Sequence, residues 1–356
     1  MKAIFFTSFA PGVAVKPNTL LTQKTLFNLV PSIRLQVMPA VRALENSGYE
    51  CFCQSLHGIN FENFDISSYS LIIYAKITAN PQKRDLIYNS IERIKYTSKQ
   101  HKIPSIVIYS NNYLEVPSIW NNIYRIIINN ASLIVTSSNS LQKSISKYSK
   151  CRSLVIEDPL TCQILPYRER NETDKHINIL WYGNNQNLTA MIKKMPSLYA
   201  LCPQSYFYSF RLLVGNLSRS KNQEFKEAVD CAPSCWEIIE KRWTSERHQK
   251  YLSISDYVLI PCGSDNFSLS ASHNRIVDAI SAGALAIASP IPSYQELYKT
   301  AIITPHIASA MRDTIGCYND IINNFRPERA LTLERFSINK NLAKWHEAID
   351  YANENH

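Results

Sequence analysis

Several features are scarce or missing in this sequence, and each absence excludes a class of protein. No run of about 20 consecutive apolar residues occurs, so no transmembrane helix is expected. The start, MKAIFFTSFAPG, has one Lys and too short an apolar run for a secretory signal peptide. The nine cysteines are scattered, and the close pairs Cys51/Cys53 and Cys231/Cys235 have poor zinc spacing with no histidine pair to complete a site. We therefore expect reduced thiols in a cytoplasmic protein, and no metal site.

The charge balance favours an anionic partner. The chain has 38 Lys and Arg against 29 Asp and Glu, a net charge of +9. Such an excess fits a nucleic acid, a phosphorylated small molecule or an anionic membrane surface, although a solvated basic surface explains it equally well. The basic residues are spread along the chain without a platform of interleaved aromatic side chains, so nucleic-acid binding is not favoured.

The length and the pattern of apolar runs predict two α/β domains. A chain of 356 residues exceeds what one core usually serves. Short apolar runs alternate with helical periodicity in both halves, which is typical of parallel sheets covered by helices. The polar segment 167–176 has no apolar periodicity and is the best linker candidate. We expect doubly wound, Rossmann-like domains over residues 1–170 and 171–330, with a helix over 331–356 that could pack back on the first domain.

The expected elements follow from these runs. In the first half, strands are expected at 3–9, 69–77, 105–110, 131–138 and 152–159, and helices at 33–50, 84–102 and 139–150. In the second half, strands are expected at 177–183, 209–216, 235–243, 255–263, 284–289 and 300–304, and helices at 187–202, 244–254, 274–283 and across 330–356.

The segment from Ser268 to Leu297, SLSASHNRIVDAISAGALAIASPIPSYQEL, carries the strongest functional signal. It predicts a helix whose apolar side faces the core, a stop at Gly283, a buried strand and a Pro-rich loop. Asn274, Arg275 and Asp278 fall in the first turns of that helix. A cation at a helix N-terminus opposes the macrodipole, so Arg275 is costly there unless an anion compensates it. A phosphate would do so, and Asp278 could accept hydrogen bonds from ribose hydroxyls. The alternative is an Arg275–Asp278 pair within the helix, with Asn274 as its cap.

Weaker candidates follow other expected strands of the second half. Gly183 and Asn184 lie between a strand and a helix, where the backbone can approach a ligand and the helix N-terminus can receive an anion. An ordinary turn with Asn187 as the helix cap is the alternative. Arg219 and Lys221 follow the next strand and are candidates for a diphosphate, although solvated loop charges are just as plausible.

Taken in order, ILWYGNNQNL, RWTSE, ISDYVLIP and NRIVDAISAGALAIASPIPSYQEL resemble the donor-binding domain of nucleotide-sugar glycosyltransferases with the GT-B architecture. In many members the donor helix carries two glutamates separated by seven residues. Asp278 takes the place of the second, which contacts the ribose, whereas Ser270 stands where the first would be. The chain looks more like the branch with Asn-Arg at the helix start. The resemblance implies a donor site of Gly183, Asn184, Arg219, Lys221, Thr244, Asn274, Arg275, Asp278 and Tyr294.

The first half agrees with the same family. SIRLQVMPAVRALENSGYE resembles the family's first helix, YAKI resembles a strand end that often carries Lys, and SNNY stands where relatives show an Asp-rich turn. The resemblance implies that Arg34, Lys76 and Asn111 contact the acceptor. Each could also be a solvated or turn residue.

The implied reaction moves a sugar from a nucleoside diphosphate to an acceptor hydroxyl, as in surface polysaccharide or glycoconjugate synthesis. Stabilising the charge of the departing diphosphate is the main task. Arg275, with His273 as a donor to phosphate and Lys76 from the first domain, forms the expected catalytic set, without a metal. No cofactor is expected, because the nucleotide sugar is a substrate. The acceptor would be a saccharide, a lipid-linked sugar or a glycoconjugate, and peripheral attachment at the inner membrane surface would suit the positive charge.

Two points stay open at the level of sequence. The catalytic base could be Asp65, His57 or Glu115, and the stereochemistry is not determined. A sugar-nucleotide epimerase of the same fold would need no acceptor. A non-catalytic scaffold is also compatible with Ser270 and with only eight glycines.

Overall fold

The computed structural model describes residues 1–8, 19–20, 31–56, 59–77, 81–115, 120–171, 173–183, 185–215 and 219–355. The chain forms two compact units: Met1–Pro159 together with Ser337–His356, and Leu160–Phe336. The second unit thus begins before the polar segment expected as the linker. Backbone hydrogen bonds explain this, because Leu165 N donates to Ser281 O (2.8 Å) and Arg168 N donates to Gly283 O (3.0 Å).

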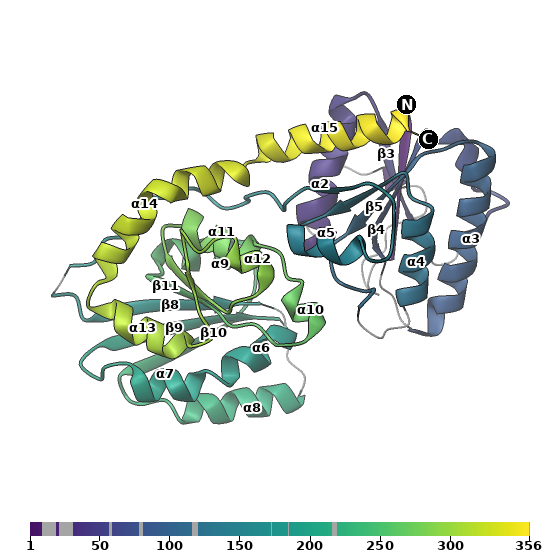
Figure 1. Ribbon diagram of the computed structural model, residues 1–356. Coiled ribbons are helices and arrows are strands. Elements are labelled where there is room, and N and C mark those ends of the chain that lie inside the picture. The colour runs from purple at the N-terminus through teal and green to yellow at the C-terminus, as the bar shows by residue number, and fades with distance from the viewer. Residues whose placement is uncertain are drawn as a thin grey trace. The chain divides into compact units, whose positions relative to one another are not determined.

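The first unit alternates strands and helices (Figure 1). Its strands are β1 (Lys2–Ser8), β2 (Thr19–Leu20), β3 (Glu50–Ser55), β4 (Leu71–Ile77), β5 (Ser105–Tyr109), β6 (Leu133–Thr136) and β7 (Ser153–Val155). Its helices are α2 (Pro31–Asn46), α3 (Arg84–Gln100), α4 (Asn121–Asn129), α5 (Asn139–Ile145) and α15 (Ile338–Glu354), with 3-10 turns at Ile66–Ser68 and Pro81–Lys83.

The first sheet has the order β2-β3-β1-β4-β5-β6-β7. All its pairs are parallel except β2 with β3. From β1 the chain adds β3 on one side and then β4 on the other, so the direction of winding switches between β1 and β4. In open α/β sheets the carboxyl ends of the strands at such a switch point form the usual ligand site. Lys76 lies at this end of β4.

The core of the first unit includes the C-terminal helix. Trp345, Ala348, Ile349 and Ala352 of α15 are buried in one cluster with residues of α2 and of the central strands. Contacts join α15 to α2 and to β6. The last helix of the chain is therefore part of the fold of the first unit.

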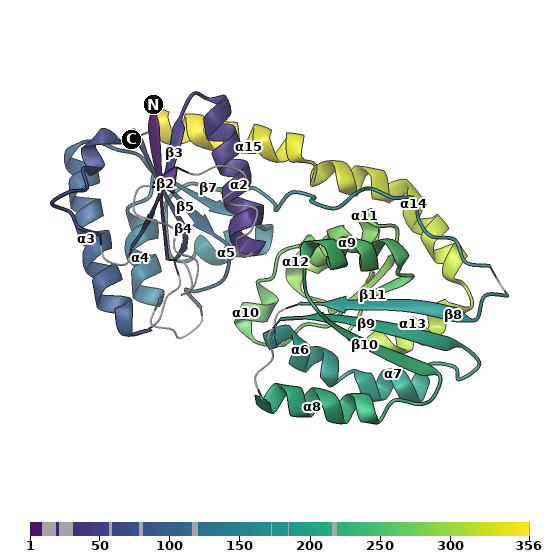
Figure 2. The same cartoon turned by 180° about the vertical axis from the view of Figure 1, so that it is seen from behind.

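The second unit repeats the architecture (Figure 2). Its strands are β8 (His176–Tyr182), β9 (Phe207–Val214), β10 (Trp236–Arg242), β11 (Tyr257–Ile260), β12 (Leu285–Ala288) and β13 (Ile302–Ile303). Its helices are α6 (Asn185–Ile192), α7 (Met195–Leu201), α8 (Arg219–Asp230), α9 (Ser245–Ile254), α10 (Asn266–Leu269), α11 (Asn274–Ser281), α12 (Pro292–Gln295), α13 (Ile307–Ile315) and α14 (Tyr318–Arg335).

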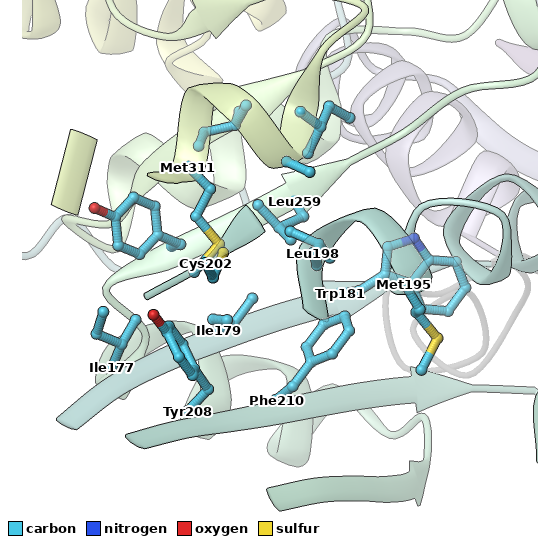
Figure 3. Packing of buried hydrophobic residues seen from close by; sticks show 14 of the residues in the cluster. Ile177, Ile179, Trp181, Met195, Leu198, Cys202, Tyr208, Phe210, Leu259 and Met311 are labelled. Atoms are coloured by element: carbon cyan, nitrogen blue, oxygen red, sulfur yellow. The ribbon is translucent and has the colours of Figure 1, made fainter. Parts of the chain in front are cut away.

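The second sheet is parallel, in the order β10-β9-β8-β11-β12-β13. This is the doubly wound order whose switch point lies between the first and fourth strands, here β8 and β11. Alternate side chains of β8 are buried in the two hydrophobic clusters that cover opposite faces of the sheet. Ile177, Ile179 and Trp181 pack under α7 and α13 (Figure 3), whereas Leu180 and Tyr182 pack with α9 and α11. A strand buried on both faces explains why INILWY is almost wholly apolar.

The expected elements are present with some differences at their boundaries. The helix expected over 187–202 is two helices, because Pro196 lies in the first turn of α7 and favours a new start there. Pro39 lies inside α2 rather than at its start. The expected C-terminal helix is interrupted: α14 ends at Arg335, and α15 begins after Ser337, whose side chain accepts from Lys340 N. Sequence reasoning missed the strands β2 and β3, the helices α4, α8, α10 and α13, and most of α14. It also predicted a loop at 290–297, where Pro292 at the first turn of α12 starts a short helix.

A stretch suited to crossing a bilayer does not occur among the helices of the described residues.

Gly283 gives a test of the fold. It has φ of 78°, and a Cβ there would overlap the carbonyl oxygen of Pro166. We expect Gly283→Ala to lower the free energy of unfolding by about 2 kcal/mol or more, because it adds left-handed strain to a backbone clash. Urea unfolding of the purified variant measures this.

Gly316→Ala is the matched control, because a Cβ there meets nothing within 4 Å and its φ is −77°. We expect that control to be neutral or slightly stabilising. Equal effects of the two substitutions would contradict the assigned packing of Gly283.

Candidate functional site

The candidate site of the second unit is the edge where β8 and β11 end. Tyr182 and Gly183 close β8, Cys262 follows β11, and α11 brings Arg275 and Asp278 to the same place. Cys262 N also donates to Ser289 Oγ (3.0 Å), which joins the end of β11 to the end of β12. We call Tyr182, Cys262, Arg275, Asp278 and Tyr294 the switch-point cluster.

Arg275 is the charged centre of this cluster. Its Nη2 donates to Cys262 Sγ (3.3 Å). The hydroxyl of the fully buried Tyr294 lies beside the guanidinium, but neither it nor Nη1 makes a hydrogen bond of good geometry among the described residues. A guanidinium is always charged, so an unsatisfied buried N–H on it is expensive. An anion or another hydrogen-bond acceptor bound beside Arg275 would satisfy this N–H group.

Asp278 is held by several groups. The Tyr182 hydroxyl lies 3.3 Å from Asp278 Oδ2 and 3.2 Å from the backbone oxygen of Arg275, so it donates to one of them at a time. Burial, with Asp278 nearby, raises the pKa of Tyr182, which keeps this hydroxyl protonated as a donor. Cys162 Sγ lies 3.3 Å from Asp278 Oδ1, and His248 Nε2 lies 3.8 Å from Oδ2. These contacts differ from the Arg275–Asp278 pair that was the alternative considered from the sequence.

The start of α11 differs from the alternative considered from sequence. The N-cap is His273 rather than Asn274, and it makes no side-chain capping bond. The apolar face is as predicted, because Ile276, Val277 and Ile280 are buried. The helix is therefore anchored by its apolar side.

The other expected donor residues lie after the strands of the same sheet. Lys221, in the first turn of α8, donates to Thr189 Oγ1 (2.8 Å). Thr244 is the N-cap of α9 and accepts from Arg247 N (3.2 Å). A Cβ on Gly183 would lie 3.1 Å from the Trp181 ring, so a larger residue there would require the ring to shift by a few tenths of an ångström. Asn184 and the side chain of Arg219 lie outside the described residues.

His273 is packed inside the second unit. It is 1% exposed, and its Nε2 lies 3.2 Å from Glu296 Oε2. Arg335, the last residue of α14, binds the same carboxylate oxygen at 2.6 Å. Half-burial alone would raise the pKa of Glu296, but hydrogen bonds from His273 and Arg335 outweigh it and lower the pKa to about 2. The carboxylate therefore ties the start of α11 and the end of α12 to the end of α14.

The first unit brings two expected acceptor residues together. Lys76 Nζ lies 3.4 Å from the Tyr113 hydroxyl, and Asn111 Nδ2 lies 3.3 Å from the same oxygen. Burial lowers the pKa of Lys76, and its backbone is left-handed, with φ of 47°. Strain of this kind in a non-glycine residue clusters at functional sites. Tyr113 was missed from the sequence, because a lone Tyr after a strand carries no pattern.

The remaining first-unit candidates occupy other places. Arg34 belongs to α2, but its side chain lies outside the described residues, as does His57. Asp65 caps the 3-10 turn before β4, accepting from Ser67 N (2.9 Å), and so lies toward the sheet edge opposite Lys76. Glu115 pairs with Lys147 at 2.8 Å. No catalytic base stands out among the described residues.

The Glu296 contacts predict an acid-dependent stability. The folded pKa of Glu296, about 2, lies below the value of about 4.3 in an unfolded chain, so its contribution is full above the unfolded value and disappears as pH falls toward 2. We expect Glu296→Gln to cost roughly 1 kcal/mol at pH 7, a figure that allows for solvent screening of the half-exposed pair. The difference from wild type should shrink between pH 4 and pH 2 in urea unfolding.

Glu328→Gln serves as the control, because the Glu328–Lys299 pair is exposed. It should change stability little at any pH. A Glu296→Gln variant whose deficit persists unchanged at low pH would contradict the role of this carboxylate.

Comparison with known proteins places the fold. No protein-family model and no curated protein sequence matches the chain. Among solved structures, HepE of Anabaena in complex with UDP is similar, with a TM-score of 0.66 and 13% identity over 98% of this chain and 100% of that one. The UDP-forming α,α-trehalose-phosphate synthase of Burkholderia vietnamiensis gives 0.59 and 9% identity, over 99% and 98% of the two chains. TarM of S. aureus gives 0.55 and 13% identity, over 80% and 54%.

At these identities the likeness concerns the fold. The strand orders of both sheets and the coverage of whole chains agree with the architecture expected from the sequence. The chain therefore has the GT-B fold, with two Rossmann-like domains.

Proposed function

We propose that this protein is a glycosyltransferase that moves a sugar from a nucleoside diphosphate sugar to an acceptor hydroxyl. The observation that carries the proposal is Arg275, whose buried Nη1 makes no hydrogen bond of good geometry with the described residues at the switch point of the second sheet. A diphosphate would supply the missing acceptor and the missing negative charge. HepE, which shares the fold, is described in complex with UDP-glucose, which supports this choice of donor.

In this proposal Arg275 stabilises the departing diphosphate. Negative charge grows on the leaving group as the glycosidic bond breaks, and a preorganised cation at that point lowers the barrier. The start of α11, with Asn274, adds the positive end of a helix dipole. Lys221 in the first turn of α8 is proposed to contribute as well, together with Arg219, whose side chain lies outside the described residues. Tyr294 offers a hydroxyl beside Arg275. This set balances the charge by itself, which supports transfer without a metal.

The nucleoside is proposed to lie against Asp278. A carboxylate at this position can accept from both ribose hydroxyls. The Tyr182 hydroxyl fixes its orientation. Gly183 and Asn184 would border the base or the phosphates, and Thr244 the far side of the site.

The acceptor is proposed to use Lys76, Asn111 and Tyr113, with Arg34 from α2. The polar atoms of Lys76, Asn111 and Tyr113 meet at the carboxyl end of β4 and β5. His273 is best suited to a positioning role, because its Nε2 faces Glu296 and holds the start of α11.

The acceptor class and the location remain part of the proposal. TarM is described in complex with α-GlcNAc-glycerol, which supports a saccharide, lipid-linked or glycoconjugate acceptor and a role in polysaccharide synthesis. The net charge of +9 would favour peripheral contact with an anionic membrane on the cytoplasmic side.

Binding of UDP tests the donor site. We expect UDP and a UDP-sugar to raise the melting temperature of the wild-type protein. Arg275→Met should bind UDP about 10- to 100-fold more weakly, the effect of losing hydrogen bonds from a charged group worth roughly 1.5–3 kcal/mol. Calorimetric titration gives the two dissociation constants.

Arg312→Ala removes an exposed arginine of α13 that pairs with Asp313, and it should bind UDP as the wild type does. A wild-type protein that binds no nucleoside diphosphate or nucleotide sugar would refute the proposed donor site. Equal affinity in Arg275→Met would refute the role of Arg275.

Substitution of Lys76 tests the acceptor side. Lys76→Met should lower the rate of sugar transfer by about tenfold or more, in the range for one group that acts on the reacting atoms. UDP affinity should be unchanged, because Lys76 belongs to the other unit. The exposed Lys143 of α5 provides the control substitution Lys143→Met. Normal transfer by Lys76→Met would remove Lys76 from the catalytic set.

A further inference from the structure

Three metal-ligating side chains meet beside the switch-point cluster. Cys162 Sγ, one ring nitrogen of His248 and a carboxylate oxygen of Asp278 all lie within 4.8 Å of one another. Cys162 Sγ is 3.3 Å from Asp278 Oδ1, and His248 Nε2 is 3.8 Å from Asp278 Oδ2. The three residues come from separate parts of the second unit: the segment before β8, α9 and α11.

The chemistry of the three groups is that of a zinc site. Thiolate, imidazole and carboxylate are the ligands that Zn²⁺ takes in proteins, at ~2.3 Å for sulfur and ~2.0–2.2 Å for nitrogen and oxygen. In a tetrahedron these bond lengths separate neighbouring ligand atoms by roughly 3.4–3.6 Å. The 3.3 Å from Cys162 Sγ to Asp278 Oδ1 and the 3.8 Å from His248 Nε2 to Asp278 Oδ2 are close to that range. Because the ligand atoms lie within 4.8 Å of one another, the three side chains would have to move closer together around an ion bound by a single carboxylate oxygen.

The surroundings of the three residues orient them. The side chains of His248 and Asp278 are 8% and 15% exposed. The Tyr182 hydroxyl lies 3.3 Å from Asp278 Oδ2, and the Tyr182 ring lies against the His248 ring at 4.2 Å between centroids. Partners of this kind fix the orientation of metal ligands and are needed for tight binding.

A path for an ion also exists. Cys162 lines a surface pocket together with Gln163, Glu246, Gln249 and Ser253. An ion can therefore reach the sulfur from solvent, and Glu246 gives the pocket a negative side chain. Three protein ligands leave the fourth position of a tetrahedron for water, which is the pattern of open zinc sites.

We propose that Cys162, His248 and Asp278 bind one zinc ion. Binding replaces the proton that the Cys162 thiol shares with Asp278: the S–H bond breaks, a Zn–S bond forms, and the proton goes to solvent. The ion joins the segment that enters the second unit to α9 and α11. This inference goes beyond the proposed transfer reaction, because the ion is not assigned to the diphosphate.

The site also bears on the nucleotide. Asp278 is the carboxylate proposed to accept hydrogen bonds from the ribose hydroxyls. A zinc ion and the ribose would therefore compete for its oxygens. We expect zinc to weaken UDP binding to the wild-type protein, whereas UDP binding in the presence of a chelator reports the donor site alone.

The test uses the full chain with zinc or Co²⁺ as the probe. After treatment with a chelator, the wild type should take up one equivalent of zinc in competition with a chromophoric indicator. With Co²⁺ it should show a near-ultraviolet thiolate-to-cobalt charge-transfer band. Cys162→Ser should lose that band, and both Cys162→Ser and His248→Gln should bind zinc at least about tenfold more weakly. Cys235→Ser, which removes another half-buried thiol of the same unit, should behave as the wild type.

The outcomes separate the two proposals. No stoichiometric zinc uptake by the wild type, or equal affinity in Cys162→Ser and His248→Gln, overturns the zinc site and leaves UDP binding in chelator unaffected. Absence of UDP binding in chelator overturns the donor site and leaves zinc uptake unaffected. Circular dichroism in chelator shows whether each variant is folded, and the two ligand variants at separate positions serve as checks on each other.

Discussion

The parallel pairing of β8 with β11 is the constraint on which the candidate site depends. Ile179 lies opposite Tyr257 and Leu180 opposite Val258, so the two strands end at the same edge of the sheet. The segments that follow leave in opposite directions, because β8 leads to β9 on one side and β11 leads to β12 on the other. Polar side chains can therefore gather at this edge without being covered by a crossover helix.

Each unit places a buried cation at the switch point of its sheet. In the first unit this is Lys76, whose backbone is left-handed and whose pKa is lowered by burial. In the second it is Arg275, with an unsatisfied Nη1. The left-handed backbone of Lys76 and the poorly satisfied Nη1 of Arg275 both cost free energy, and an anion bound beside either cation would offset part of that cost. Each of the two sheets thus places a positively charged side chain at its switch point, where an anion or another acceptor could bind.

The sequence predicts the fold well because apolar periodicity and strand–helix alternation are local signals. The buried face of α11 was predicted from Ile276, Val277 and Ile280, and the stop at Gly283 from its residue type. The short strand β3 was missed because ECFCQS has little aliphatic content and directly follows a helix. The boundary near residue 170 was misplaced because segment 160–169 joins the second unit through backbone hydrogen bonds, which leave no apolar pattern.

Side-chain partners were less predictable, since they join residues far apart in the chain. Arg275 and Asp278 are one turn apart, and a local rule therefore predicts that they pair. In the structure Arg275 turns to Cys262, and Asp278 meets Cys162 and His248. A search for metal sites by cysteine and histidine spacing fails for the same reason, because these three ligands are separated by most of a domain.

The position of α15 in the fold affects the order in which the two units can fold during synthesis. Its residues Trp345 and Ile349 complete the core of the first unit, yet they are synthesised after the whole of the second unit. While the ribosome produces the second unit, the facing surface of α2 and β6 has no partner from its own chain. Domains usually fold in the order in which they emerge. Here the second unit can complete its own core first, whereas the core of the first unit is complete only after α15 has been synthesised.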